Sequence, residues 1–126
     1  MKRLFLFVLL GIFLAVGVSA APANKLGLEW QANTETNLAG YKVYYNTRGP
    51  GAPYDGTGQV EGNSPIDVAN VTEFYFNSMD FRAQDFWFVV TAYSTEGFES
   101  GYSNEVTSKG LIPAPPAGCV LRIPNE

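Results

Sequence analysis

The sequence predicts an all-β domain, an antiparallel β-sandwich, from three observations. Seven Tyr and nine Phe stand among 126 residues, and aromatic side chains favour strands. Short segments in which apolar and polar residues alternate recur along the chain, with turn residues between them. Beyond the N-terminal apolar stretch, no window of the sequence repeats with the period of a helix. A chain of this length supports one domain.

The first expected strand covers residues 25–31, in which polar and apolar side chains alternate. Leu26, Leu28 and Trp30 share one face of this strand, and we expect that face to be buried. Trp30 is therefore expected in the core rather than on a ligand-binding surface. Residues 33–37 form a polar turn cluster that ends the strand.

The middle of the chain predicts further strands and a long loop. Residues 40–46 alternate with Tyr and Val on one face, as a half-buried strand does. Residues 48–58 hold four Gly and two Pro and predict a loop. Residues 66–68 carry a weak strand signal, and the aromatic segment 73–77 is typical of a strand.

The strongest strand signal lies in residues 86–93. The expected core face of this strand carries Phe86, Phe88, Val90 and Ala92. Alternation then places Trp87 and Tyr93 on the opposite, outer face of the sheet. Residues 95–101 predict a loop, and residues 103–108 predict a last strand.

The N-terminus has the pattern of a secretory signal peptide over residues 1–20. Basic residues precede an uncharged apolar segment, residues 4–18, and small side chains at Val18 and Ala20 fit cleavage after Ala20. The alternative is an uncleaved membrane anchor, but an apolar run of about 15 residues is shorter than the roughly 20 needed to span a bilayer. We therefore expect a secreted protein, extracellular or periplasmic, with no stable membrane span after cleavage. The rest of the chain divides into a domain over 21–109 and a Pro-rich tail over 110–126.

The charge balance and the scarcity of His and Cys exclude several classes of function. The net charge is −4, and removal of Lys2 and Arg3 would leave six basic against twelve acidic residues, or −6, which argues against a nucleic-acid partner. The absence of His removes the commonest general base and metal ligand. One Cys cannot form an intrachain disulfide or a Cys-rich zinc site. We expect no cofactor and no bound metal.

The carboxylates do not provide a catalytic pattern either. Glu96 and Glu99 lie close in sequence, as do Asp80 and Asp85, but glycoside hydrolysis needs two carboxylates at a defined separation in a cleft. A small sandwich has little room for such a cleft. A calcium site through Asp55, or through the two glutamates, lacks the ligand spacing of known calcium loops. The chain is therefore expected not to be an enzyme.

Five segments, in order along residues 24–108, resemble the fibronectin type III domain. They are Leu26-Gly-Leu-Glu-Trp30, Asn37 to Tyr45, Ile66 to Thr72 with Phe74-Tyr-Phe76, Phe88 to Tyr93, and Glu99 to Val106. The chain is most similar to bacterial secreted members of this family. The resemblance implies an immunoglobulin-like sandwich of seven strands that binds a partner or acts as a spacer between other parts, and that does not catalyse a reaction.

Two departures from the family's pattern affect what we expect. The family's sixth strand normally begins with a Tyr whose hydroxyl ties down the preceding corner, and Phe86 stands there instead, so we expect a looser corner. The family also has a strand before the Trp-bearing one, whereas after cleavage only residues 21–24 would precede Lys25. We therefore expect the first strand to be missing or supplied by another segment, and the edge of residues 25–31 to lie open.

The candidate surface for a partner consists of five aromatic residues: Tyr54, Trp87, Tyr93, Phe98 and Tyr102. Trp87 and Tyr93 could stack on a sugar or a partner, or could serve only in packing across strands. Tyr54 lies near the tip of the loop over 46–58, which is either a recognition loop or a flexible connection. Phe98 and Tyr102 lie beside carboxylates in the last loop.

The tail predicts a stiff linker over residues 111–118, because Pro is frequent there. Cys119 to Ile123 then resembles one short strand, ended by Pro124. Three interpretations remain open: a disordered end, a strand docked on its own domain, or a strand that pairs antiparallel with residues 25–31 of a neighbouring copy. In the last case the assembly residues are Cys119, Val120, Leu121 and Ile123, and the cysteine could join two chains.

These patterns together predict a non-catalytic exported module for binding or adhesion, which recognises a protein or a polysaccharide at the cell surface. One alternative is a structural subunit of an extracellular assembly, a homo-oligomer joined by exchange of the C-terminal tail. Another is an accessory carbohydrate-binding protein that acts beside a separate enzyme.

Overall fold

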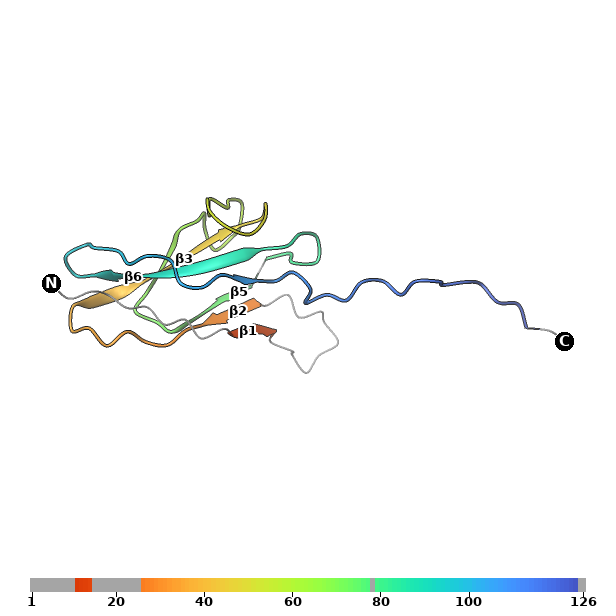
Figure 1. Ribbon diagram of the computed structural model, residues 1–126, viewed down its shortest axis with the longest axis horizontal. Helices are drawn as coiled ribbons and strands as arrows, with labels where there is room; N and C mark the ends of the chain where they lie inside the picture. Colours follow the sequence, from red (N-terminus) through yellow and green to blue (C-terminus); the bar gives the residue numbers. More distant parts are fainter. Residues whose placement is uncertain (1–10, 15–25, 78, 125–126) are drawn as a thin grey trace.

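The computed structural model describes residues 11–14, 26–77 and 79–124. These residues form two antiparallel sheets and contain no helix, which confirms the predicted all-β class and is consistent with a β-sandwich (Figure 1). The sheets have the strand orders β1-β2-β5 and β4-β3-β6-β7. The strands are β1 (Gly11–Leu14), β2 (Leu26–Glu29), β3 (Leu38–Asn46), β4 (Ile66–Ala69), β5 (Glu73–Phe76), β6 (Trp87–Ser94) and β7 (Val106–Thr107). Within the described ranges, no helix is present that could cross a membrane.

The core lies between the two sheets, and alternation along each strand decides which side chains enter it. Leu26 and Leu28 of β2 are buried, and Trp30 beyond its end is 4% exposed, which confirms Trp30 as a core residue. Phe76 of β5 lies beside Leu26 in the same sheet, and the facing side chains come from β3 and β6: Tyr41, Val43, Tyr45, Phe88, Val90 and Ala92. The alternate positions of β3 and β6 therefore point to the outer face of the four-stranded sheet.

The turn that leads into β6 is closed by apolar side chains. Met79 and Phe81 are buried in the core, as is Phe86. The Asp80 carboxylate accepts hydrogen bonds from the backbone N–H groups of residues 82 and 83, both at 3.2 Å. Apolar burial and this acidic cap thus fasten the corner without a tyrosine hydroxyl.

The edge of β2 that we expected to lie open is occupied in this chain. β1 pairs antiparallel with β2, in a register from Gly11 opposite Glu29 to Leu14 opposite Leu26. The first strand is therefore not missing but supplied by another segment, which lies inside the expected signal peptide. The remaining residues of that signal peptide, the expected cleavage site at Ala20 and residues 21–24 lie outside the described ranges.

Gly40 lets a side chain of β6 cross over β3. A Cβ atom on Gly40 would lie 2.6 Å from the hydroxyl oxygen of Tyr93 and 3.0 Å from the backbone carbon of Ala69. Only a residue without a side chain leaves room for the Tyr93 ring at this point. The ring can therefore lie across β3 and reach Asp67 on β4.

Serine side chains replace backbone carbonyls along the edge of β6 that faces β7 and the segment before it. The hydroxyl oxygens of Ser100, Ser103 and Ser108 each accept a hydrogen bond at 2.9 Å, from the backbone N–H groups of residues 92, 90 and 86. The expected last strand over 103–108 accordingly forms a regular ladder only at Val106–Thr107. Along the rest of this edge, Ser100 and Ser103 each accept through the hydroxyl and donate through the backbone N–H, to the carbonyls of Ala92 and Val90.

In the single chain, Cys119 to Ile123 does not form the expected short strand and does not dock on its own domain. Residues 112–124 are exposed and have no regular structure, while Leu111 packs against the core. Cys119 is a free, exposed thiol. Figure 1 shows the tail leaving the domain at the end where β2 begins and continuing away from it.

Candidate functional site

The outer face of the four-stranded sheet carries a connected row of tyrosines and carboxylates. β3 contributes Lys42 and Tyr44 to this face, and β6 contributes Thr91 and Tyr93. These residues occupy positions that alternate with the core residues of the same strands, so they point away from the core. The loops that follow β3 and β6 complete the row.

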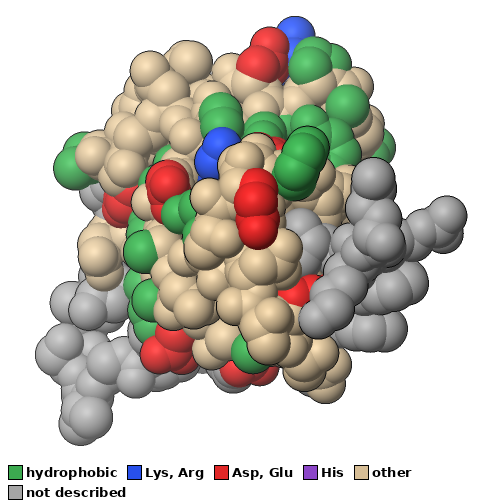
Figure 2. Space-filling view, turned by 90° about the vertical axis from the view of Figure 1, so that its left-hand side faces the viewer, with side chains coloured by type: hydrophobic (Ala, Val, Ile, Leu, Met, Phe, Trp, Pro, Cys, Tyr) green, Lys and Arg blue, Asp and Glu red, His purple; other side chains and the backbone are tan. Residues whose placement is uncertain are grey.

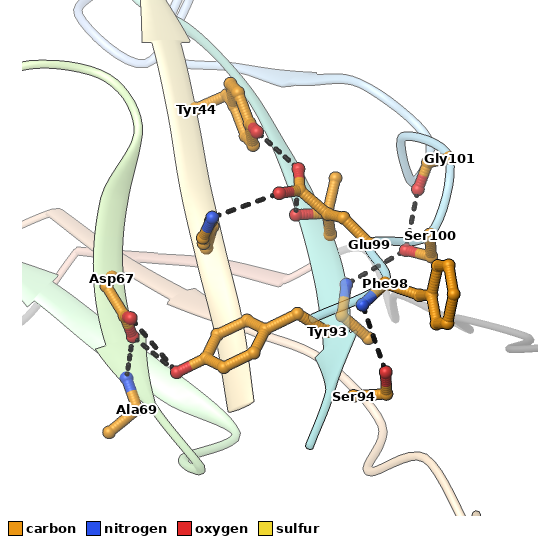
Figure 3. Close-up of polar contacts among 12 residues, drawn as sticks. Tyr44, Asp67, Ala69, Tyr93, Ser94, Phe98, Glu99, Ser100 and Gly101 are labelled. Carbon is orange, nitrogen blue, oxygen red and sulfur yellow. Dashed lines mark hydrogen bonds and ion pairs between the residues drawn. The ribbon is translucent and has the colours of Figure 1, made fainter. Parts of the chain in front are cut away.

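Glu99 joins the two central strands by accepting three hydrogen bonds. Its carboxylate accepts from the Tyr44 hydroxyl, from Lys42 Nζ at 3.1 Å and from Thr91 Oγ1 at 3.1 Å. Figure 3 shows the side chains of Tyr44 and Glu99 pointing toward each other. Burial by itself would raise the pKa of Glu99, but the bonds from Tyr44, Lys42 and Thr91 outweigh it and hold that pKa below its ordinary value. Glu99 is therefore an anion at neutral pH, held in a fixed position.

Tyr93 ties β6 to the outer strand β4. Its hydroxyl donates to the Asp67 carboxylate, with distances of 2.8 and 3.0 Å to the two oxygens (Figure 3). Lys42 Nζ lies 5.5 Å from the centre of the Tyr93 ring, within range of a cation–π contact. The bond to Asp67, with a smaller contribution from burial, raises the pKa of Tyr93. Tyr93 is half-buried, so only part of its ring is open to a partner.

Trp87 does not form an exposed stacking surface, because the loop after β3 folds over it. Trp87 and Tyr54 are each 8% exposed and pack with Val89 in a small cluster separate from the main core. The Tyr54 hydroxyl donates to the Glu105 carboxylate, which also accepts the backbone N–H of Gly51 at 2.7 Å. Burial and the bond to Glu105 raise the pKa of Tyr54 to about 12. The expectation that Trp87 and Tyr54 are open to a ligand is therefore wrong.

The loop over residues 46–58 is built around one buried amide side chain, so a flexible connection is not what the structure shows. Asn46 is 2% exposed. Its side-chain N–H₂ donates to the carbonyls of Gly51 and Pro53 at 2.9 and 3.2 Å, and its side-chain oxygen accepts the N–H of Arg48 at 3.2 Å. Gly56 N–H donates to the Tyr45 carbonyl at 2.7 Å. These bonds hold Tyr54 over the sheet.

Tyr102 is the exposed centre of the row. Its ring packs edge-to-face against Tyr44 and against Tyr54, with 5.2 Å between ring centres in both contacts. The ring is 51% exposed. Because Glu99 and Glu105 hold the hydroxyls of the two flanking tyrosines, the position of Tyr102 is fixed before any partner arrives. We call Tyr44, Tyr54 and Tyr102 the tyrosine row.

Phe98 forms a separate apolar tip at the turn between β6 and the last strand. It is 74% exposed, and its backbone N–H donates to Ser94 Oγ at 3.1 Å. Gly97 at φ 90° makes the tight turn that presents it. In Figure 3 the Phe98 ring points away from the polar contacts. Figure 2 views the pole where this turn lies, with hydrophobic side chains gathered on its upper part beside acidic ones.

Two carboxylates of the outer face are already engaged in hydrogen bonds. Glu99 and Glu105 already accept tyrosine hydroxyls. In the described part of the chain, no group of three or more His, Cys, Asp or Glu side chains is placed to hold a metal ion. A shallow groove lined by residues 68 and 70–75 contains no residue of the tyrosine row, and a smaller hollow lies within the loop over 46–53, directly before Tyr54.

The five aromatic residues of the expected partner surface therefore differ in exposure. Phe98 and Tyr102 are exposed, Tyr93 is half-buried, and Tyr54 and Trp87 are covered. Sequence reasoning missed the carboxylates that position the tyrosines. The position of Glu99 just after the turn that follows β6 could have revealed this role. The chain turns back there to pair with β6, and from that place the Glu99 side chain reaches Lys42 and Tyr44 of β3.

Comparison with known proteins gives the chain no family. No model of a known protein family matches it, and no curated protein matches it in sequence. The description of the tyrosine row therefore stands on the contacts and exposures given above.

Proposed function

We propose that this chain is an exported, non-catalytic binding module of the fibronectin type III kind, which recognises a protein or a polysaccharide at the cell surface. The strand orders β1-β2-β5 and β4-β3-β6-β7 support the family assignment, because they bring together the segments whose sequences resemble that domain. The N-terminal pattern of basic, apolar and small residues supports export.

The exposed ring of Tyr102 is the observation that carries the proposed binding function. A half-exposed aromatic ring offers apolar area and stacking to a sugar or a protein side chain. Its two tyrosine neighbours and their carboxylate partners are already ordered, so little side-chain freedom is lost on binding. The net charge of −4 disfavours a polyanionic partner, so a neutral polysaccharide or a protein fits better.

The test compares Tyr102→Ala with Tyr102→Phe in the secreted chain. The probes are insoluble cellulose, chitin and xylan in pull-downs, and intact cells of the source organism. We expect Tyr102→Ala to weaken binding about tenfold or more and Tyr102→Phe to retain it, because stacking needs the ring and not the hydroxyl.

Tyr75→Ala is the matched control, since Tyr75 is 38% exposed but lies on β5 of the other sheet. Loss of binding in the control and the Tyr102 variants alike would point to the fold rather than the site. Undiminished binding by Tyr102→Ala would remove the tyrosine row from the proposal. Binding to a polysaccharide supports an accessory carbohydrate-binding role, and binding to cells through protein supports adhesion.

A further inference from the structure

Removal of the expected signal peptide would uncover the edge of β2 that β1 now occupies. In the full chain β2 pairs with β5 on one side and with β1 on the other. β1, at Gly11–Leu14, lies before the expected cleavage position at Ala20. Cleavage would therefore take away a strand that is paired over four positions and leave the backbone groups on that edge of β2 without their partners. This step rests on the proposed export.

We propose that Val120–Ile123 of a second copy takes the place of β1 on β2 after export. The tail carries an unusual set of exposed apolar side chains: Val120 is 73%, Leu121 94% and Ile123 80% exposed. Exposed apolar residues in alternate positions, next to a backbone with free hydrogen-bonding groups, are what strand addition to a sheet edge requires.

The sequence of the tail fits the register that β1 uses. If Val120 stands opposite Glu29, as Gly11 does, then Leu121 stands opposite Leu28 and Ile123 opposite Leu26. Leu26 and Leu28 are buried and face the core, and residues directly opposite in an antiparallel pair share a face. The two apolar tail residues would therefore enter the core. Pro124 follows at once and ends the strand.

Charge favours the same register. Glu29 and Glu73 stand directly opposite each other on the outer face of β2 and β5, which is an unfavourable pairing of like charges. In the proposed register Arg122 stands opposite Gly27, on that same outer face and diagonal to Glu29. A long basic side chain reaches a diagonal neighbour, so Arg122 would offset the two carboxylates.

The direction of the tail selects a neighbouring copy over the same molecule. Figure 1 shows the tail leaving at the end where β2 begins and continuing outward. To pair antiparallel with its own β2, the tail would have to reverse twice, and Pro113, Pro115 and Pro116 make residues 109–119 stiff. If the second copy lies beyond the end of the domain where the tail leaves, the tail runs along its β2 in the direction of β1 with no reversal. Residues 109–119, which join the domain to the added strand, reach at most about 40 Å.

The resulting contact is head-to-tail, because the tail of one copy enters the edge of the next. A contact of this type does not close on itself unless the rotation between copies forms a ring, so it builds an open chain of copies. The proposal differs from the tyrosine row both in residues and in face, so each can fail without the other.

The experiment uses the full chain secreted through its own leader, with mass spectrometry to establish the N-terminus. Light scattering after size exclusion then measures the molar mass over a hundredfold range of protein concentration, both with and without reductant. We expect multiples of the cleaved monomer that dissociate on dilution. The double variant Leu121→Asp with Ile123→Asp should be monomeric throughout. Val60→Asp, at an equally exposed apolar residue outside the tail and β2, should assemble as the wild type does.

A second measurement keeps the test independent of assembly. The monomeric double variant retains a vacant β2 edge and should bind a synthetic peptide of residues 117–126 in solution, at least tenfold more tightly than the same peptide with Leu121 and Ile123 changed to Asp. A wild-type chain that is monomeric and a double variant that ignores the peptide would overturn the proposal. So would a secreted chain that keeps residues 11–14, or oligomers that persist in the double variant or disappear with reductant alone.

Discussion

The carboxylate of Glu99 holds several side chains of the outer face in place. It receives the Tyr44 hydroxyl, the Lys42 ammonium and the Thr91 hydroxyl, and it thereby fixes residues from both central strands. The Glu105 carboxylate does the same for Tyr54 and the loop backbone at Gly51. Two acidic side chains thus set the geometry of an aromatic surface that they do not themselves form.

The substitution Glu99→Gln tests this role through its pH dependence. The folded pKa of Glu99 lies below the ordinary 4.5, so its contribution to stability is present above pH 4.5 and is lost as the pH falls through the folded value. Because the side chain is 28% exposed, we expect a cost of about 1 kcal/mol at pH 7. Urea unfolding from pH 7 to pH 3 should show a shallower acid loss in the variant. Equal slopes in the two proteins would contradict the assignment.

At the scale of elements, the edge of β6 shows how a strand can be satisfied without a full partner strand. Ser100, Ser103 and Ser108 supply acceptor oxygens where a regular strand would supply carbonyls. Ser108 is the most enclosed part of this edge, at 2% exposed, and its own N–H donates to the Phe86 carbonyl at 3.0 Å. The side chain and the backbone of one residue therefore hold both groups of Phe86.

Replacement of Ser108 by Ala should destabilise the domain by about 1–3 kcal/mol, because it leaves the buried N–H of Phe86 without its acceptor. The free energy of unfolding is measured with urea, and amide hydrogen exchange at Phe86 should become faster. Thr95→Ala, on an exposed turn, serves as the control and should change stability by less than about 0.5 kcal/mol. An unchanged exchange rate at Phe86 in Ser108→Ala would contradict the role of the hydroxyl.

The sequence predicted β2, β3, β5 and β6 well because the alternation of side chains is a local property. It predicted Trp30 as core for the same reason, and it predicted Phe98 and Tyr102 as surface because they lie in the loop after β6. It could not predict that Tyr54 covers Trp87, since that contact depends on a loop whose path is set by the buried amide of Asn46. Nor could it assign β1, because an apolar leader and a strand of a sandwich can have the same composition.

At the scale of the whole molecule, the tail and the domain are energetically separate. Leu111 packs against the core, whereas residues 112–124 are exposed. In dilute solution a chain that ends at Leu111 should therefore unfold at the same urea concentration as the full chain. Leu111→Ala in the full chain should lower the free energy of unfolding by about 1 kcal/mol, since a partly buried leucine contributes less than a fully buried one. A stability loss on removing residues 112–126 would show that the tail folds back.

The two sheets also end very differently, and this sets how copies of the chain can gather. The four-stranded sheet ends beside β6 in the short strand β7, and serine hydroxyls accept the neighbouring amides of β6. If β1 is cleaved away, β2 offers four positions in line. Strand addition at this edge would then extend the three-stranded sheet of each copy by one strand and join the copies in a single file.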